Sequence, residues 1–276
     1  MICECFCQVH IRSQRLPALP RQCLQAWRHV VQKPVGSIVD PPFVLVISLM
    51  TLEPSKKFSS TQSCLLAALD TRIAYTEVVE SKDALGILWN RKPAAILITD
   101  PKIAGSSNPH PTLTATLVKY ARGGGRVIFG GAFSSHVTPD ASDAFFKTVW
   151  GLKWKMALCA SVQSRFVLNA HTPLRLPCGL DLPKVYSANA ALLEGVTAED
   201  AVYAPAEDGA ALLVPVAYAR FGDGYVGYHS AINAQDEASD ILLSMLSGPA
   251  CNLPKPAMAS TQEELVAHGI KPSSDD

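Results

Sequence analysis

The chain has 276 residues, of which 48% are hydrophobic and 17% are charged, and its 24 basic side chains balance its 24 acidic ones. This length allows one full core with appended segments, and the interspersed charge offers no basic surface for a phosphate backbone, so nucleic acid is not an expected partner. The longest apolar run, at 43–50, is interrupted by Ser48 and is far shorter than the roughly 20 residues that cross a bilayer, so no membrane partner is expected.

The cysteine pattern argues against a disulfide framework. Three of the 8 cysteines, Cys3, Cys5 and Cys7, fall in the first seven residues, and no apolar signal segment precedes the regular part of the chain. Reduced thiols in a cytoplasmic protein are therefore the expectation. The spacing of the three is too close for a usual zinc site, so we expect no metal, and no cofactor motif stands out.

Residues 1–41 differ in composition from the rest of the chain. Between positions 1 and 39 the only acid is Glu4, against four arginines and Lys33. This predicts either a disordered extension or a mitochondrial presequence, which would change the expected location from the cytoplasm to mitochondria. The prolines of this segment argue against a long amphipathic helix.

From residue 42 onward the pattern becomes regular. Residues 43–49 are almost continuously apolar and β-branched, which is typical of a strand buried on both faces. The predicted elements are then a helix at 60–69, a strand at 76–79, a helix from Ser81 as its cap to Lys92 with Trp89 on its apolar face, a strand at 94–99, a helix at 112–122 and a strand at 126–129. Strands that alternate with helices predict a flavodoxin-like, doubly wound α/β fold: a mostly parallel sheet with helices on both faces.

The second half is less regular. Between 137 and 205 the periodicity weakens around a possible strand at 161–168, and we expect an inserted, loop-rich subdomain over the carboxyl edge of the sheet, the edge at which parallel strands end. Residues 210–219 and 225–229 predict a hairpin about Gly222–Gly224, and 236–246 predict a final helix. The expected domains are thus an extension at 1–41, an α/β domain at 42–248 and a flexible tail at 249–276.

Two segments carry a family resemblance: Tyr-Ala-Arg-Gly-Gly-Gly-Arg-Val-Ile at 120–128 and Gly-Asp-Gly-Tyr-Val-Gly-Tyr at 222–228. With the order of elements over 43–246, they resemble the class I glutamine amidotransferase-like superfamily, and Phe133-Ser134-Ser135 is similar to a group of fungal proteins with this fold. The resemblance implies a nucleophilic Cys on a turn after the strand at 126–129, and a later His-x-Glu pair.

Neither of those catalytic features is present. Gly130-Gly131-Ala132 stands at the turn, and His229 is followed by Ser230 and Ala231. Without the Cys and without a Cys-His-Glu triad, the chain is expected to be a catalytically degenerate member, a pseudoenzyme that acts as a ligand-binding or accessory protein rather than an enzyme.

A serine-type hydrolase acting on a small ester or amide is the alternative. Ser134 or Ser135 would be the nucleophile and His229 the base, oriented by Asp236 or Asp100. The competing interpretation is that both serines turn the loop or cap a helix and that His229 is a packed strand residue.

A small-molecule pocket is expected where doubly wound folds bind ligands, at the carboxyl edge of the sheet. Asp100 is also explained by an Asp-Pro turn. A third function, a protein-interaction module with 150–205 as its contact surface, stays open. The expected pocket residues are Thr99, Asp100, Gly130, Gly131, His136, Asn233 and Asp236.

Overall fold

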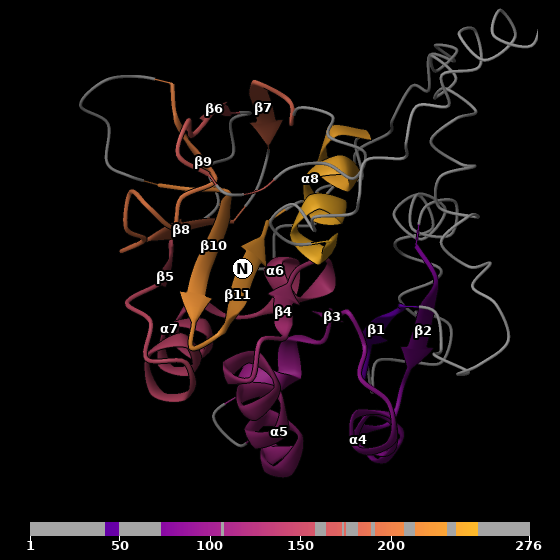
Figure 1. Ribbon diagram of the computed structural model, residues 1–276. Helices are drawn as coiled ribbons and strands as arrows, with labels where there is room; N and C mark the ends of the chain where they lie inside the picture. The colour runs from indigo at the N-terminus through magenta and orange to yellow at the C-terminus, as the bar shows by residue number, and fades with distance from the viewer. Residues whose placement is uncertain are drawn as a thin grey trace, which may run out of the picture. The chain divides into compact units, whose positions relative to one another are not determined.

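The computed structural model describes residues 42–49, 73–105, 108–157, 164–172, 174, 182–188, 191–206, 213–230 and 236–247. The predicted helix at 60–69, the segments at 1–41 and 249–276, and Asn233 lie outside these residues. A six-stranded central sheet organises the described part (Figure 1). Its strands are β1 (Val44–Ile47), β2 (Tyr75–Val78), β3 (Ala95–Ile98), β4 (Arg126–Phe129), β10 (Val216–Phe221) and β11 (Gly224–His229).

The strand order across this sheet is β10-β11-β4-β3-β1-β2. Every neighbouring pair is parallel except β10 and β11, which form an antiparallel hairpin. The prediction of an α/β fold around a mostly parallel sheet is confirmed. The order β2-β1-β3-β4 is compatible with a flavodoxin-like arrangement, in which β1 and β3 lie at the point where the direction of winding reverses.

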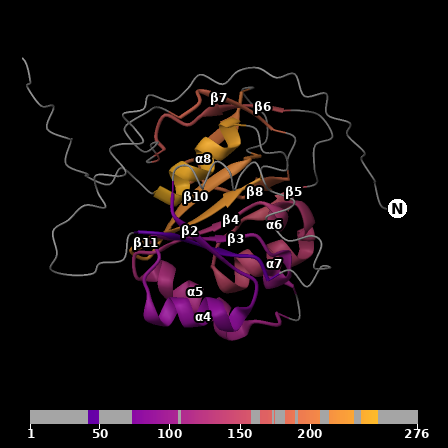
Figure 2. The same cartoon turned by 90° about the vertical axis from the view of Figure 1, so that its right-hand side faces the viewer.

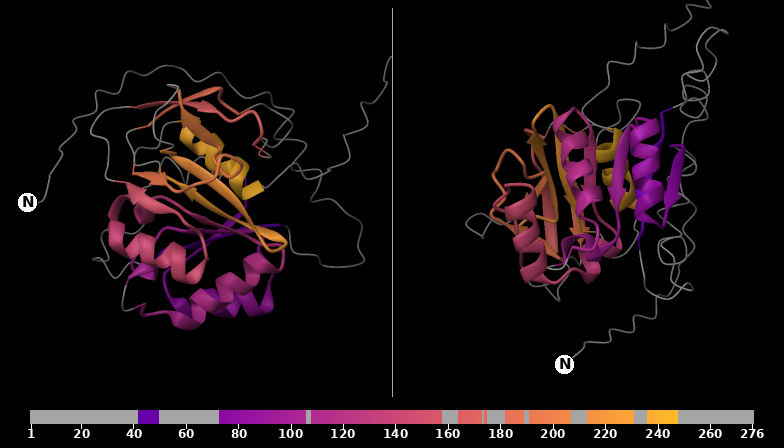
Figure 3. Two further views of the ribbon diagram at one scale, coloured as in Figure 1. Left: turned by 90° about the vertical axis from the view of Figure 1, so that its left-hand side faces the viewer. Right: turned by 90° about the horizontal axis from the view of Figure 1, so that it is seen from below.

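Helices cover the two faces of the sheet unequally. Buried strand residues such as Leu45, Ile96 and Val127 pack in one core with the helices that precede residue 150, whereas α8 packs against β3 and β4 with residues such as Met245 on the other face. Figures 2 and 3 show these helices on opposite sides of the strands. The helices are α4 (Ser81–Asn90), α5 (Pro111–Arg122), α6 (Ala132–His136), α7 (Pro139–Val149) and α8 (Asp236–Ser247), with a 3-10 turn η2 (Pro101–Ala104). None in the described ranges is long and apolar enough to cross a lipid bilayer.

Two details of α4 differ from the sequence prediction. Glu80 occupies the N-cap position without a side-chain cap, and Ser81 is the first helical residue. Trp89, predicted on the packed face, is 71% exposed, while Ala84 is fully buried. The apolar residues of α4 cover a wider arc of the helix than the part that packs against the protein. Ala84 and Leu88 lie on the packed side, whereas Trp89 lies about 140° around the helix from Ala84.

An aromatic cluster joins β4 to the helices that follow it. The ring of Phe129 lies 4.9 Å from that of Phe133, 5.5 Å from Phe145 and 5.6 Å from Phe146 and Trp150, measured between centroids. Most of these pairs are edge-to-face, the arrangement that the aromatic quadrupole favours. The end of β4 is thereby tied to α6 and α7.

The section predicted to be loop-rich contains short strands. They form a pair, β5 (Lys155–Ala157) with β8 (Leu192–Glu194), and a three-stranded sheet of β6 (Ser164–Leu168), β7 (Val185–Ala188) and β9 (Tyr203–Pro205). Bridges from Leu193 to Val214 and from Ala201 to Ala217 join this section to the start of β10. Since β10 is antiparallel to β11, its start lies at the carboxyl edge of the sheet.

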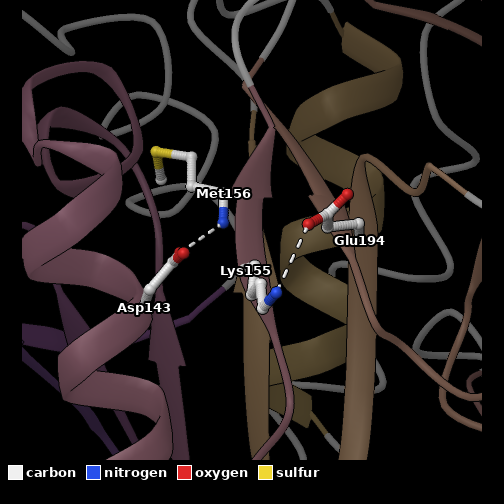
Figure 4. Close-up of polar contacts among 4 residues, drawn as sticks. All are labelled: Asp143, Lys155, Met156 and Glu194. Carbon is white, nitrogen blue, oxygen red and sulfur yellow. Dashed lines mark hydrogen bonds and ion pairs between the residues drawn. The ribbon is translucent and has the colours of Figure 1, made fainter.

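Two polar contacts attach β5 to its neighbours (Figure 4). The backbone N–H of Met156 donates to Asp143 Oδ1 of α7 at 2.7 Å, and Lys155 Nζ lies 3.9 Å from Glu194 Oε1 of β8. The first contact satisfies a backbone donor with a carboxylate. The second joins two exposed side chains and contributes little, because water screens it.

The two contacts predict opposite results on removal. Asp143→Ala leaves the Met156 N–H without its charged acceptor and is expected to lower the free energy of unfolding by about 1–2 kcal/mol, with Asp143→Asn losing less. Lys155→Ala is the matched control and is expected to change it by less than about 0.5 kcal/mol. Urea denaturation of the variants measures both; an equal effect of the two alanine changes would contradict this assignment.

Candidate functional site at the carboxyl edge

The register of the parallel strands sets the ends of β1, β3, β4 and β11 side by side. Ile47 pairs with Ile98, Ile98 with Phe129, and Phe129 with Tyr228. The residues that directly follow these paired ones are therefore neighbours at the carboxyl edge: Ser48, Thr99, Gly130 and His229. One residue further along the four segments come Leu49, Asp100, Gly131 and Ser230.

The turn after β4 has the geometry of a nucleophile elbow but carries no nucleophile. Gly131 has φ 59° and ψ −129°, a conformation that side-chain-bearing residues rarely adopt, and α6 begins at the next residue, Ala132. A sharp, strained strand-to-helix turn of this kind exposes the catalytic Ser in hydrolase elbows. Here the strained position is filled by glycine.

The serines beyond the elbow are occupied by the backbone of their own helix. Ser134 Oγ donates to Gly131 O at 2.9 Å, and Ser135 Oγ donates to the same carbonyl at 3.3 Å. His136 Nδ1 lies 3.2 Å from Ala132 O. Ser134 is buried, whereas Ser135 and His136 are exposed. This agrees with the interpretation in which the serines shape the turn.

His229 ends β11 inside the protein. It is 2% exposed, its ring centroid lies 6.4 Å from that of Tyr186, and its Nε2 has no hydrogen-bond partner among the described residues. Burial lowers the pKa of His229 to about 4, so the imidazole is neutral at pH 7. The structure thus places no serine hydroxyl on Nε2, and the proposed pairing of Ser134 or Ser135 with His229 stays a prediction.

Asp100 follows β3 and has two different carboxylate oxygens. Oδ1 accepts the Lys102 N–H at 2.7 Å, which confirms the turn interpretation, while Oδ2 is buried without a partner in the described part of the chain. Burial raises the pKa of Asp100, against the opposing effect of that N–H and of the Lys102 and His110 charges. Thr99 is engaged within the sheet, since its Oγ1 donates to Ile47 O at 3.2 Å.

Of the remaining predicted positions, the structure describes Gly130 in full and Asp236 only in its backbone. Gly130 lies between Thr99 and His229, and a Cβ there would stand 3.3 Å from the His229 carbonyl oxygen, so glycine lets β4 and β11 approach. Asp236 begins α8, but its side chain is outside the described structure, as is the whole of Asn233. No group of three or more His, Cys, Asp or Glu side chains within the described ranges is arranged to hold a metal ion.

Two residues of this edge were missed by the sequence prediction. Ser48 follows β1 and Ser230 follows β11; they are 1% and 0% exposed, and neither hydroxyl has a partner among the described residues. The signal that could have found them is their position directly after a predicted parallel strand. The sequence prediction instead counts Ser48 as part of the apolar strand at 43–49.

Comparisons with known proteins give distant structural likenesses only. No family model and no curated protein matches the chain. The cytoplasmic protein STM1381 of Salmonella typhimurium aligns with TM-score 0.49 and 12% identity over 75% of this chain and 99% of that one. A ThuA-like protein of Bacteroides uniformis aligns with TM-score 0.44 and 12% identity over 78% and 95% of the two chains.

A second kind of neighbour is much larger. The β-galactosidase of Halorubrum lacusprofundi aligns with TM-score 0.47 and 19% identity over 81% of this chain. The chain spans about a third of the length of the β-galactosidases it matches, 32% in this case. Likenesses at these values carry no information on activity or ligand.

The elbow glycine yields a stability prediction. Gly131→Ala forces a Cβ into a backbone region that residues with side chains rarely adopt and is expected to cost about 1–3 kcal/mol of unfolding free energy. Gly86→Ala is the control: Gly86 is inside α4 with nothing within 4 Å of its would-be Cβ, so alanine should stabilise by about 0.5–1 kcal/mol. Thermal melts of both variants test this, and an unchanged Gly131→Ala protein would show that the turn is not strained.

Burial of His229 predicts a loss of stability on acidification. Below the ordinary pKa of 6.5 the unfolded chain binds a proton that folded His229 refuses until about pH 4. The His229 contribution is therefore complete above pH 6.5 and falls by about 2–3 kcal/mol towards pH 4. Urea denaturation of the wild type and His229→Gln across this range measures it. The difference between the two proteins must shrink as the pH falls; a constant difference would contradict a buried neutral imidazole.

Proposed function

We propose that this chain is a catalytically degenerate member of the class I glutamine amidotransferase-like superfamily, with a flavodoxin-like arrangement, and that it binds a small molecule at the carboxyl edge of its sheet without turning it over. The observation that carries this proposal is the set of buried polar groups at that edge. The family assignment rests on the segments at 120–128 and 222–228 together with the elbow geometry after β4.

Four buried side chains at the carboxyl edge each have an atom without a hydrogen-bond partner in the described structure: Ser48 Oγ, Asp100 Oδ2, His229 Nε2 and Ser230 Oγ. Folded proteins pair the large majority of such groups, because an unpaired buried polar atom costs about 1–3 kcal/mol. Their concentration at the strand ends, where this class of fold binds ligands, supports a ligand that supplies the missing partners.

The absence of turnover is supported by the elbow. Gly131 occupies its strained position and has no side chain to attack a substrate, and the nearest hydroxyls, of Ser134 and Ser135, donate to the Gly131 carbonyl. A serine nucleophile would need a base within hydrogen-bond reach. The neutral His229 is a weak base at pH 7, since its pKa is lowered to about 4.

A serine hydrolase is the second candidate, favoured by one observation: His229 Nε2 lacks a partner among the described residues and so is free to accept a proton. Catalytic hydrogen bonds are often loose before substrate binds. A serine-directed phosphonate separates the two functions. Labelling lost in both Ser134→Ala and His229→Ala, in folded proteins, would favour the hydrolase; absence of labelling favours the non-catalytic protein.

Ligand binding is tested with a mixture of small polar metabolites, screened by saturation-transfer NMR on the full chain. Ser230→Ala is expected to weaken any hit about tenfold, because a buried hydrogen bond to the ligand is lost. Ser142→Ala is the matched control: its hydroxyl is equally buried and without a partner in the described residues, but it lies in α7.

Neither serine variant should be less stable than the wild type in the absence of ligand, since each removes a buried hydroxyl without a partner in the described residues, a change that is neutral to stabilising. If Ser230→Ala and Ser142→Ala weaken ligand binding equally, the ligand does not bind at the carboxyl edge as proposed. Turnover of a bound metabolite, followed by NMR over hours, would refute the non-catalytic assignment.

A further inference from the structure

A second group of polar side chains lies at the opposite, amino edge of the sheet, where the parallel strands begin. Arg126 opens β4 and stands directly beside Tyr225 of β11, and Tyr225 in turn pairs with Arg220 of β10. Neighbouring residues in register share one face of a sheet. A row of two arginines with a tyrosine between them therefore lies on one face of three adjacent strands.

A second phenol completes this row. The ring of Tyr218 stacks on that of Tyr225, with centroids 4.7 Å apart and planes inclined by 13°. Tyr218 is 3% exposed, and its Oη has no hydrogen-bond partner in the described part of the chain. Burial raises the pKa of Tyr218, so the phenol stays protonated at neutral pH and can donate.

Neither arginine forms an ion pair with an acid among the described residues. Arg126 Nη2 donates to Ala94 O at 2.8 Å, while its Nε is buried without a partner in the described residues. Arg220 Nε donates to Gly222 O at 3.2 Å. The ion pairs found within the described ranges, Lys82 with Glu80 and Lys155 with Glu194, include neither arginine. Asp223, in the hairpin turn, forms no ion pair with them in that part of the structure.

The row reaches solvent at Arg220, whereas Arg126 Nε and Tyr218 Oη are themselves buried. Arg126 and Tyr225 are half-buried and Arg220 is exposed. An arginine partly withdrawn from water and left without a counter-ion is costly, and its planar fork matches the two oxygens of a carboxylate or phosphoryl group. The Tyr218 hydroxyl, which has no hydrogen-bond partner in the described residues, adds a donor on the ring that stacks on Tyr225.

We propose that Arg126, Arg220 and the hydroxyl of Tyr218 form a binding site for an oxyanion, a phosphoryl or carboxylate group, at the amino edge of the sheet. This site is separate from the carboxyl-edge cluster, because the strands β4 and β11 run between them. The two ends are also opposite in character: the amino edge offers charged donors, whereas the described residues of the carboxyl edge offer hydroxyls, a carboxylate and a neutral imidazole.

Isothermal titration of the full chain with inorganic phosphate and, separately, with acetate tests this site, with sodium chloride keeping the ionic strength constant. Saturable binding of either anion is expected, and the tighter one identifies the source of the oxyanion. Arg126→Gln is expected to weaken it at least tenfold and Tyr218→Phe about three- to tenfold, the losses typical of one charged and one neutral hydrogen bond.

Arg122→Gln is the matched control, because Arg122 carries the same charge at the same edge but is exposed, with its guanidinium 5.3 Å from the ring centroid of Phe221, which faces the opposite side of the sheet from Arg220. It should change the affinity less than twofold. Tyr218→Phe removes only a hydroxyl without a partner in the described residues and is expected to keep the fold, so it remains informative if Arg126→Gln melts early. No saturable binding of either anion, equal weakening by Arg126→Gln and Arg122→Gln, or full affinity in Tyr218→Phe would overturn the proposal.

Discussion

The packing around Phe129 is the constraint on which the rest of the site depends. This ring ends β4 in contact with Phe133, Phe145, Phe146 and Trp150, so the strand, the short helix after it and α7 are held by one buried side chain. The chain must turn within two residues to bring Phe133 back onto Phe129. Residues with side chains rarely adopt the backbone that this demands, and a glycine, Gly131, fills the position.

The same constraint orders the polar groups around the elbow. With β4 fixed, its register with β3 and β11 sets the segments that carry Asp100 and Ser230 on either side of the segment that carries Gly131. Serines of α6 then satisfy the carbonyl that the turn exposes. What remains without a partner in the described residues belongs to the neighbouring strands, which favours a bound ligand over an internal catalytic dyad.

The polar atoms without partners in the described residues differ in chemistry between the two edges of the sheet. Ser48, Asp100, His229 and Ser230 stand where the parallel strands end, whereas Arg126 opens β4 and the Tyr218 ring stacks on Tyr225 near the start of β11. Backbone demands explain part of each: Arg126 bonds the Ala94 carbonyl and Asp100 caps η2. The other polar atoms of these two side chains, Arg126 Nε and Asp100 Oδ2, have no hydrogen-bond partner in the described residues.

The sequence by itself determined the strands at 43–49, 94–99 and 126–129, the helix at 112–122 and the closing hairpin and helix, because apolar period and glycine stops are local signals. It also located the empty elbow, since Gly131 and Ala132 have no attacking group. It did not reveal Ser48, Ser230 or the Tyr218–Tyr225 stack, nor that Trp89 faces solvent. Those depend on which strands become neighbours and in what register, and that is decided by packing between residues distant in the chain, which only the tertiary structure contains.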